Sequence, residues 1–352
     1  MTTDTATAAG AELQLTADNG LARITLNRPR AINALNQPMI AGIVDSLEAW
    51  RNDDSVAAVL IDGAGERGLC AGGDIRVIYE DVKSGGNESR WFWRDEYAMN
   101  VAISEYPKPY IALMDGLVMG GGVGVSAHGS IRIVTERSKV GMPETGIGFA
   151  PDVGGTYLLS RAPGQLGTHL ALSGLTAGPA DAIACGLADT FVSSERLADL
   201  RAALAANPGQ AAAIVADFAS EPGPTPFLDA QEWIDECYGS DSVEQIVERL
   251  GSHPDAEARN TAEILLTKAP TSLKVTLASL RAARSMTLRE VIEQEYRVSV
   301  ALTERPDLVE GVRAQIIDKD RNPQWSPAFL PEVTSADVDA ILNTDTAEGV
   351  FG

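Results

Sequence analysis

Two glycine-rich segments carry backbone groups that could act on a substrate. One is Ala-Gly-Gly-Asp at 71–74, and the other is Gly-Gly-Gly at 120–122, after the strand-like run at 110–114. Glycine lets the main chain come close to a ligand, and the first amides of a helix are unpaired and point outward. If each segment directs one N–H group at the same oxygen, the pair would stabilise an enolate or a tetrahedral oxyanion.

The triple glycine does not fit the other glycine motifs. A dinucleotide fingerprint would need glycine at a position where the chain has Val125 or Ala127. A P-loop needs a Gly-Lys pair, which the sequence lacks, and a nucleophile elbow would need glycine in place of His128. Close packing of a helix on a sheet remains an alternative explanation for the three glycines.

A loop at 142–155 carries two acids in apolar surroundings. It is rich in glycine and proline, and Glu144 and Asp152 each follow a proline. Because loops are usually polar, an apolar loop with two acids indicates the wall of a pocket. In a partly dry pocket, repulsion and desolvation would raise the pKa of at least one of them. The structural alternatives are a salt bridge for Glu144 and a helix N-cap for Asp152.

Composition limits the classes of partner and cofactor. The chain has 352 residues and a net charge of −21, which argues against nucleic acid and anionic membranes as partners. The three cysteines and three histidines have no metal-ligand or disulfide spacing, so we expect no metal and no redox cofactor. Residues 1–10 lack the pattern of a signal peptide, and no apolar run approaches a membrane span. We therefore expect a soluble, cytoplasmic protein.

The elements that must position these segments follow from periodicity and turn signals. Alternating residues around Asn19-Gly20 predict a hairpin of 12–16 and 21–26, followed by a helix at 38–50 and a buried strand at 56–61. Helices are expected at 74–82 and, rich in aromatic residues, at 91–105, with short strands at 131–134 and 139–140. The chain is mostly helical from 161, with a linker at 221–226. This order predicts an α/β fold with a helical C-terminal region.

The expected domain organisation has four parts. A flexible tail occupies residues 1–11 and the α/β core occupies 12–220. A helical region at 227–330 packs on that core, and a second tail follows at 331–352.

The order of the motifs resembles that of the crotonase (enoyl-CoA hydratase/isomerase) superfamily. The motifs are Asn-Arg-Pro at 27–29, Asn-Ala-Leu at 33–35, Ala-Gly-Gly-Asp-Ile at 71–75, Gly-Gly-Gly at 120–122 and Pro-Glu-Thr at 143–145. The resemblance implies a ββα spiral whose two glycine loops form an oxyanion hole for an acyl-CoA thioester.

Further motifs are similar to those of the 3-hydroxyisobutyryl-CoA hydrolase branch. They are Cys-Ala-Gly-Gly-Asp-Ile-Arg at 70–76, Pro-Asp-Val-Gly-Gly at 151–155, Pro-Thr-Ser-Leu-Lys at 270–274, Glu-Tyr-Arg at 295–297, Glu-Gly-Val-Arg-Ala at 310–314 and Pro-Gln-Trp at 323–325. Hydratases of the superfamily place a catalytic glutamate two residues after the triple glycine, where this chain has Gly124. Hydration uses a pair of carboxylates, so the resemblance implies hydrolysis of a 3-hydroxyacyl-CoA in valine breakdown instead.

The resemblance also implies roles for single residues. The amides of Gly73 and Gly121 would bind the thioester oxygen. Glu144 would attack the carbonyl to form a mixed anhydride, or would activate water. Asp152 would hold the hydroxyl end of the substrate or assist the water, and Glu96 would help to bind that hydroxyl. From the residues alone, Glu96 beside Arg94 and Asp95 would belong to a solvated helix face.

Contacts to coenzyme A are expected at Arg30, Ala71 and Ile75, and Arg28, Arg67 and Arg76 also flank the expected site. Superfamily members often form trimers, so a homo-oligomer is expected unless the helical region covers that surface. Two alternatives remain, namely an enoyl-CoA hydratase or isomerase and a non-catalytic acyl-CoA-binding protein.

Overall fold

The computed structural model describes residues 11–352, which form two compact units. The sheet unit comprises residues 11–73, 98–140 and 177–225, and the helical unit comprises 74–97, 141–176 and 226–352. All but one residue of the expected tail at 1–11 lies outside the described residues. The predicted domains are continuous in the sequence, whereas each unit gathers three separate stretches because its internal contacts join distant segments.

A six-stranded sheet forms the centre of the sheet unit. Its order is β1 (Leu13–Asp18), β2 (Leu21–Leu26), β3 (Ala58–Gly63), β5 (Tyr110–Met114), β7 (Ile131–Val134) and β10 (Thr190–Phe191). The first pair is antiparallel and the remaining pairs are parallel. Asn19 and Gly20 join β1 to β2 with positive φ angles of 51° and 88°, as a two-residue hairpin turn requires. The predicted hairpin is confirmed.

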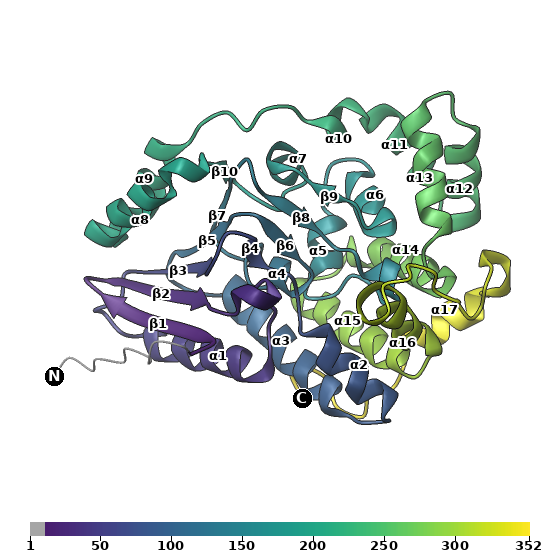
Figure 1. The fold of residues 1–352 in the computed structure, drawn as a ribbon, viewed down its shortest axis with the longest axis horizontal. Coiled ribbons are helices and arrows are strands. Elements are labelled where there is room, and N and C mark those ends of the chain that lie inside the picture. The colour runs from purple at the N-terminus through teal and green to yellow at the C-terminus, as the bar shows by residue number, and fades with distance from the viewer. Residues whose placement is uncertain (1–10) are drawn as a thin grey trace. The chain divides into compact units, whose positions relative to one another are not determined.

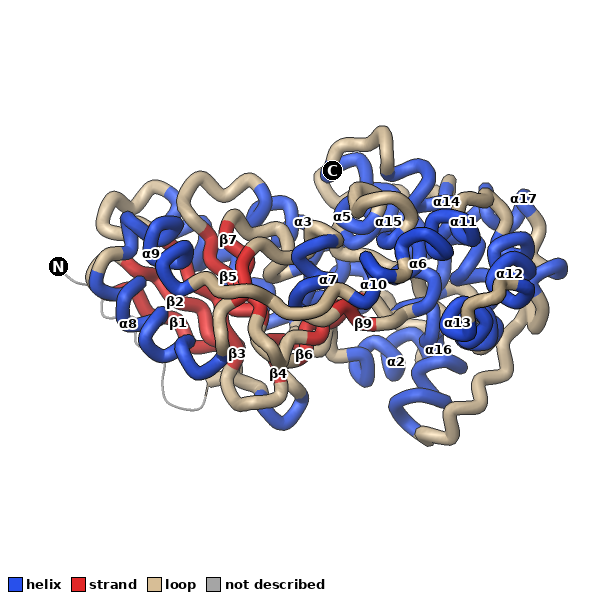
Figure 2. The backbone as a smooth tube through the Cα atoms, turned by 90° about the horizontal axis from the view of Figure 1, so that it is seen from above, coloured by secondary structure: helices blue, strands red, loops and turns tan. Residues whose placement is uncertain are grey.

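Helices cover the central sheet because its parallel strands are apolar on both faces. Helix α1 (Gln37–Arg51) contacts β1 and β2 (Figure 1), and its N-terminus is capped by Asn36, which accepts a hydrogen bond from the Met39 N–H at 3.0 Å. Helices α8 (Leu197–Ala206) and α9 (Ala211–Phe218) lie beside the sheet (Figure 2) and share an apolar core with it. The predicted helix at 38–50 is confirmed.

Strands β4 (Gly68–Cys70) and β6 (Leu117–Met119) begin a second sheet, of order β4-β6-β8-β9. The chain passes between the two units within β8 (Lys139–Gly141) and β9 (Thr176–Ala177). The remaining elements of the sheet unit are η1 (Pro29–Ala31), α4 (Gly121–Gly124), α7 (Pro179–Ala184), η3 (Ser194–Arg196) and η4 (Pro208–Gln210). Helix α3 (Glu88–Ser104) contributes its second half to the sheet unit and its first half to the helical unit.

The helical unit is built around α14 (Pro270–Ala283) and α15 (Leu288–Thr303). Its other elements are α2 (Ile75–Lys83), η2 (Glu144–Ile147), α5 (Gly155–Leu159), α6 (Leu166–Ser173), α10 (Pro226–Asp229), α11 (Gln231–Tyr238), α12 (Val243–Ser252), α13 (Ala256–Leu266), α16 (Pro306–Val312), η5 (Arg313–Ile317), η6 (Leu330–Glu332) and α17 (Ser335–Leu342). Helix α17 contacts α14 and α15, although it lies in the segment 331–352 that we expected to be a tail. Among residues 11–352, no helix is long and apolar enough to cross a bilayer.

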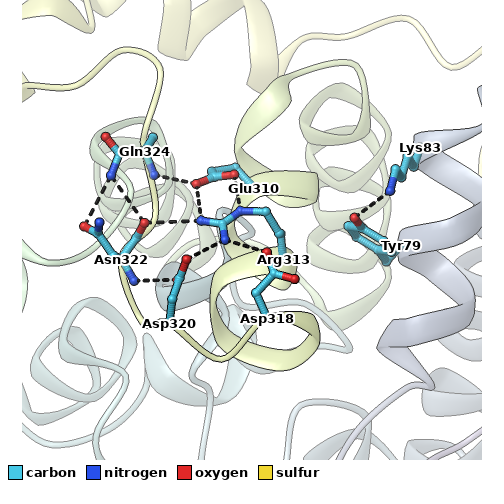
Figure 3. Close-up of polar contacts among 8 residues, drawn as sticks. All are labelled: Tyr79, Lys83, Glu310, Arg313, Asp318, Asp320, Asn322 and Gln324. Atoms are coloured by element: carbon cyan, nitrogen blue, oxygen red, sulfur yellow. Dashed lines mark hydrogen bonds and ion pairs between the residues drawn. The ribbon is translucent and has the colours of Figure 1, made fainter.

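Arg313 organises the chain after α16 (Figure 3). Its guanidinium donates two hydrogen bonds of 2.8 Å to Glu310 and further ones to Asp318 and Asp320, at 2.8 and 2.7 Å. The Gln324 N–H donates to Glu310 at 2.7 Å, which closes the loop. This forked arrangement matches arginine and explains why the Glu-Gly-Val-Arg motif fixes local structure.

Candidate active site

The two glycine loops lie side by side in the sheet unit. They follow β4 and β6, which pair in parallel, so both loops leave the same edge of the second sheet. A Cβ atom added to Gly72 would lie 3.6 Å from the Gly121 nitrogen and 3.3 Å from the Met119 oxygen. A Cβ atom on Gly122 would lie 2.4 Å from the Cys70 oxygen, so no side chain fits there. Close packing therefore explains one of the three glycines.

The amides of Gly73 and Gly121 are available to a ligand. Gly121 is the first residue of α4, after Gly120 with φ 51° and ψ −119°, so its N–H precedes the ladder of helical hydrogen bonds. Within residues 11–352, neither the Gly121 N–H nor the Gly73 N–H donates a hydrogen bond. The structure brings together the two loops that the sequence singled out for an oxyanion.

The turn that carries Arg30 is joined to the first glycine loop. The Ala71 N–H donates to the Ile32 oxygen at 2.9 Å, and the Leu35 N–H donates to the Gly72 oxygen at 2.8 Å. Arg30 itself is exposed in η1, with no ion pair among the described residues. The turn thus holds Ala71 of the glycine loop in place, while the Arg30 side chain remains in solvent.

The other arginines near the expected thioester site have protein partners. Arg28 pairs with Glu12 at 3.0 Å, and Arg67 donates to the Pro29 oxygen. In the helical unit, Ile75 is the first residue of α2, and the Arg76 guanidinium donates to the Ile316 oxygen at 3.1 Å.

In the helical unit, the acidic loop (residues 142–155) is packed tightly against neighbouring elements. The Phe149 ring stacks on Trp93 of α3 with centroids 5.0 Å apart. A Cβ atom on Gly311 would lie 2.4 Å from the Ile147 carbonyl carbon, and one on Gly148 would lie 2.2 Å from the Asp307 oxygen. The loop is apolar because it packs against α3 and α16, while Glu144 lies in η2 and Asp152 just before α5.

Four acids are buried together in this unit. Glu96 and Glu295 are 2% exposed, and Glu144 and Asp152 are 7% exposed. One oxygen of Glu96 (Oε1) and one of Glu144 (Oε2) are buried without a hydrogen-bond partner among residues 11–352. Such oxygens are costly to bury, and they are the groups that a bound hydroxyl or water would satisfy. The solvated-face interpretation of Glu96 is wrong, because Arg94 and Asp95 are more exposed while Glu96 faces inward.

Burial raises the pKa of each of these acids. Desolvation first, and the Asp152 charge second, raise the pKa values of Glu96 and Glu144 well above their usual range. Burial raises the pKa of Asp152 to about 7 against the opposing hydrogen bond from Tyr97, and it raises that of Glu295 to about 8 against hydrogen bonds from Thr156 and Gly154. These are the shifts expected of acids that are buried close to one another.

Asp152 is held by a tyrosine that sequence reasoning missed. The Tyr97 hydroxyl lies 2.7 Å from Asp152 Oδ2 and 2.7 Å from Ser299 Oγ. The structural alternative, in which Asp152 caps a helix, is wrong, since the N-cap residue of α5 is Gly154 and the Asp152 side chain turns to Tyr97 instead. Asp74 does occupy the N-cap position of α2, although its side chain makes no capping hydrogen bond.

Glu295, and not Asp152, caps helix α5. Its carboxylate accepts hydrogen bonds from the Gly154 N–H at 2.6 Å and from the Thr156 N–H and hydroxyl at 2.9 and 2.6 Å. The signal in the sequence was spacing, since Glu295 and Ser299 are four residues apart and therefore share one face of α15. Among residues 11–352, no group of three or more His, Cys, Asp or Glu side chains is arranged to hold a metal ion.

Comparisons with known proteins identify the family of this chain. The family model described as Enoyl-CoA hydratase/isomerase matches residues 21–342. The mitochondrial 3-hydroxyisobutyryl-CoA hydrolase of Xenopus tropicalis is 42% identical over 330 residues, which covers 91% of this chain and 86% of the relative. The human protein of the same name is 42% identical over 324 residues, or 90% and 84% of the two chains.

Solved structures cover almost the whole chain. A structure described as a carnitinyl-CoA dehydratase from Mycobacterium thermoresistibile has a TM-score of 0.93 at 48% identity and covers 96% of this chain and 98% of its own. One described as an enoyl-CoA hydratase from Rhodobacter sphaeroides has a TM-score of 0.89 at 37% identity and covers 97% and 99%. These matches confirm the predicted crotonase-type α/β fold.

Proposed function

Because the chain belongs to the enoyl-CoA hydratase/isomerase family, we propose that it hydrolyses a short-chain 3-hydroxyacyl-CoA thioester. The proposed substrate is 3-hydroxyisobutyryl-CoA, and the products are 3-hydroxyisobutyrate and coenzyme A, a step of valine breakdown. The relatives from Xenopus tropicalis and human are named for this reaction. One observation carries the proposal, namely that Glu144 is buried with an unpartnered oxygen while position 124 has no second acid.

In the proposed reaction, the N–H groups of Gly73 and Gly121 donate to the thioester oxygen. Negative charge develops there when a nucleophile attacks the carbonyl carbon, and two preorganised donors stabilise it. Glu144 attacks directly, forming a mixed anhydride and releasing the CoA thiolate, and water then cleaves the anhydride. Alternatively, Glu144 takes a proton from water, whose oxygen attacks the carbonyl carbon, and the C–S bond then breaks to release the CoA thiolate. Both routes need the ionised carboxylate, whose pKa is raised by burial, so turnover should increase with pH.

The second acid of the loop binds the other end of the substrate. Asp152 and Glu96 accept or donate hydrogen bonds at the 3-hydroxyl group, which would satisfy the buried Glu96 oxygen. A substrate without that hydroxyl would leave these buried polar groups unpaired, which costs affinity. This arrangement supports selectivity for hydroxyacyl over plain acyl thioesters.

Three further features belong to the proposal. The reaction needs no metal or redox cofactor, since coenzyme A enters as part of the substrate. The chain forms a homo-oligomer, which the molar mass measured by light scattering would test. We keep a cytoplasmic location as a proposal, although the relatives named above are mitochondrial, and fractionation of the source cells would decide.

Thiol release from a panel of acyl-CoAs tests the assignment. We expect release from 3-hydroxyisobutyryl-CoA, weaker release from 3-hydroxypropionyl-CoA, and no change in the double-bond absorbance of crotonyl-CoA. EDTA should leave the rate unchanged. Rapid loss of the crotonyl absorbance without thiol release would contradict the proposal, and so would strong inhibition by the chelator. No turnover with tight acyl-CoA binding would indicate a binding protein instead.

One finding favours a second candidate, reversible hydration of an enoyl-CoA. The structure at 48% identity is described as a dehydratase of carnitinyl-CoA. Against this candidate, hydration uses a pair of carboxylates to orient water and exchange protons, and position 124 is glycine here. The crotonyl-CoA measurement above separates the two candidates.

A further inference from the structure

The Asp152 carboxylate is hydrogen-bonded to a series of two buried hydroxyl groups, which have no role in the substrate contacts proposed above. Tyr97 is fully buried, and its hydroxyl lies between Asp152 Oδ2 and Ser299 Oγ, 2.7 Å from each. Ser299 is 1% exposed. The three groups come from α3, the acidic loop and α15, so three separate elements contribute to this hydrogen-bonded series.

We propose that Tyr97 and Ser299 are positioning residues, which form a reversible hydrogen-bond relay that satisfies Asp152 both with and without a proton. A hydroxyl group is both a donor and an acceptor, whereas a backbone N–H or an ammonium group only donates and could serve only the ionised carboxylate. The relay therefore suits an acid that exchanges a proton during turnover.

The two states of the relay differ only in the direction of the donors. With Asp152 ionised, Ser299 donates to Tyr97 Oη and the Tyr97 hydroxyl donates to Asp152 Oδ2. When Asp152 gains a proton on Oδ2, the new O–H group donates a hydrogen bond to Tyr97 Oη. The Tyr97 hydroxyl then turns to donate a hydrogen bond to Ser299 Oγ. No proton passes along the relay and no covalent bond changes except the O–H bond formed at Asp152. In both states, a hydrogen bond joins Asp152 to Tyr97 and another joins Tyr97 to Ser299.

The electrostatic surroundings of Asp152 act on its protonation. Asp152 is buried near the carboxyl groups of Glu96 on α3, Glu144 on η2 and Glu295 on α15, and all three interact with its charge. These neighbours and desolvation favour the protonated acid, and the hydrogen bond from Tyr97 opposes them. The hydrogen bond from Tyr97 thereby holds the pKa of Asp152, at about 7, below the value that burial alone would give.

Titration of Asp152 tests the relay directly. The probe is the carbon-13 signal of its carboxyl group in protein labelled at aspartate, identified with Asp152→Asn and followed against pH. In Tyr97→Phe, loss of a hydrogen bond to a charged group should raise the midpoint by about 1 to 2 pH units. Ser299→Ala removes only the outer member and should shift the midpoint by less. Tyr296→Phe is the matched control, because its ring packs edge-on against Tyr97, 6.3 Å away, and it should leave the midpoint unchanged.

The contribution to catalysis rests on the proposed function and is read separately from the pH profile of thiol release. A midpoint in Tyr97→Phe that differs from wild type by less than about 0.3 pH units, a fifth of the expected shift, would overturn the relay. If Tyr97→Phe fails to fold, a midpoint in Ser299→Ala that equals wild type overturns it as well. If wild type releases no thiol while the midpoint still shifts, the proposed function fails and the relay stands.

Discussion

Glu295 accepts hydrogen bonds from both the backbone N–H and the hydroxyl of Thr156, at 2.9 and 2.6 Å, across 139 residues of chain. With its bond to Gly154, this acid fixes the turn just after Asp152. The intervening Val153 has φ 53°, which is strained for a β-branched residue. Such strain persists only where the surroundings over-determine the backbone, and it marks sites where position is important.

Replacing Glu295 should therefore weaken the site without touching the substrate. Glu295→Ala leaves three buried donors unsatisfied, so we expect a loss of about 1–3 kcal/mol of unfolding free energy or more. Turnover should fall because Asp152 loses its fixed position, and Glu295→Gln, which keeps one acceptor oxygen, should recover part of it. Urea unfolding and thiol release measure the two effects. Wild-type kinetics in Glu295→Ala would show that the turn after Asp152 keeps its conformation without Glu295.

The two acids of the loop should have different kinetic effects. Glu144→Gln keeps the shape and removes the reactive oxygen, so turnover should fall by about 10²–10⁴. Asp152→Asn still forms hydrogen bonds, so it should lose less turnover and raise the apparent Michaelis constant. Glu263→Gln, at an exposed position on α13, is the control. If Asp152→Asn is inactive while Glu144→Gln stays within a few-fold of wild type, the two roles are reversed.

Burial of Glu96 should make stability depend on pH. Its pKa is raised in the folded state, so the folded protein binds a proton that the unfolded chain releases at lower pH. The stability from this group is complete below its unfolded pKa and is lost as pH increases toward the folded one. Glu96→Gln mimics the protonated form and should gain up to about 1.4 kcal/mol per pH unit relative to wild type. Urea unfolding at pH 5.5 and 7.5 measures this; an equal difference at both would contradict it.

Gly122 should tolerate no side chain. Gly122→Ala places a methyl group against the Cys70 carbonyl, and the clash should cost about 1–3 kcal/mol and displace the Gly121 amide. Gly209→Ala is the matched control, since nothing lies within 4 Å of its added Cβ. Thermal unfolding and thiol release should separate the two variants. Equal behaviour would mean that the glycine loops can move apart.

Replacing Arg313 should loosen the segment that follows α16. Arg313→Lys keeps the charge but loses the fork that joins Glu310 to two aspartates, so we expect the segment after α16 to be held less firmly. Limited proteolysis should then cut the segment 313–324 faster than in wild type. Arg259→Lys, which alters an exposed arginine bound to two carbonyl oxygens, is the control. Identical cleavage of both variants would remove Arg313 from this role.

The sequence by itself determined the features that depend on a few neighbouring residues. Asn19 and Gly20 tolerate positive φ and so predicted the hairpin, and Pro38 predicted the start of α1. The glycine loops and the proline-flanked acids were visible because glycine and proline restrict or free the backbone wherever they occur. Gly124 was equally informative, because a residue without a side chain cannot supply a second carboxylate.

Only the tertiary structure decided how the acids are used. Tyr97 and Asp152 are 55 residues apart and Tyr97 and Ser299 are 202 apart, so no local pattern links them. A buried glutamate and an exposed one have the same helix propensity, which is why Glu96 resembled a solvated residue. Burial, hydrogen-bond partners and raised pKa values arise from packing between distant segments, and it was packing that gave the cap of α5 to Glu295 instead of Asp152.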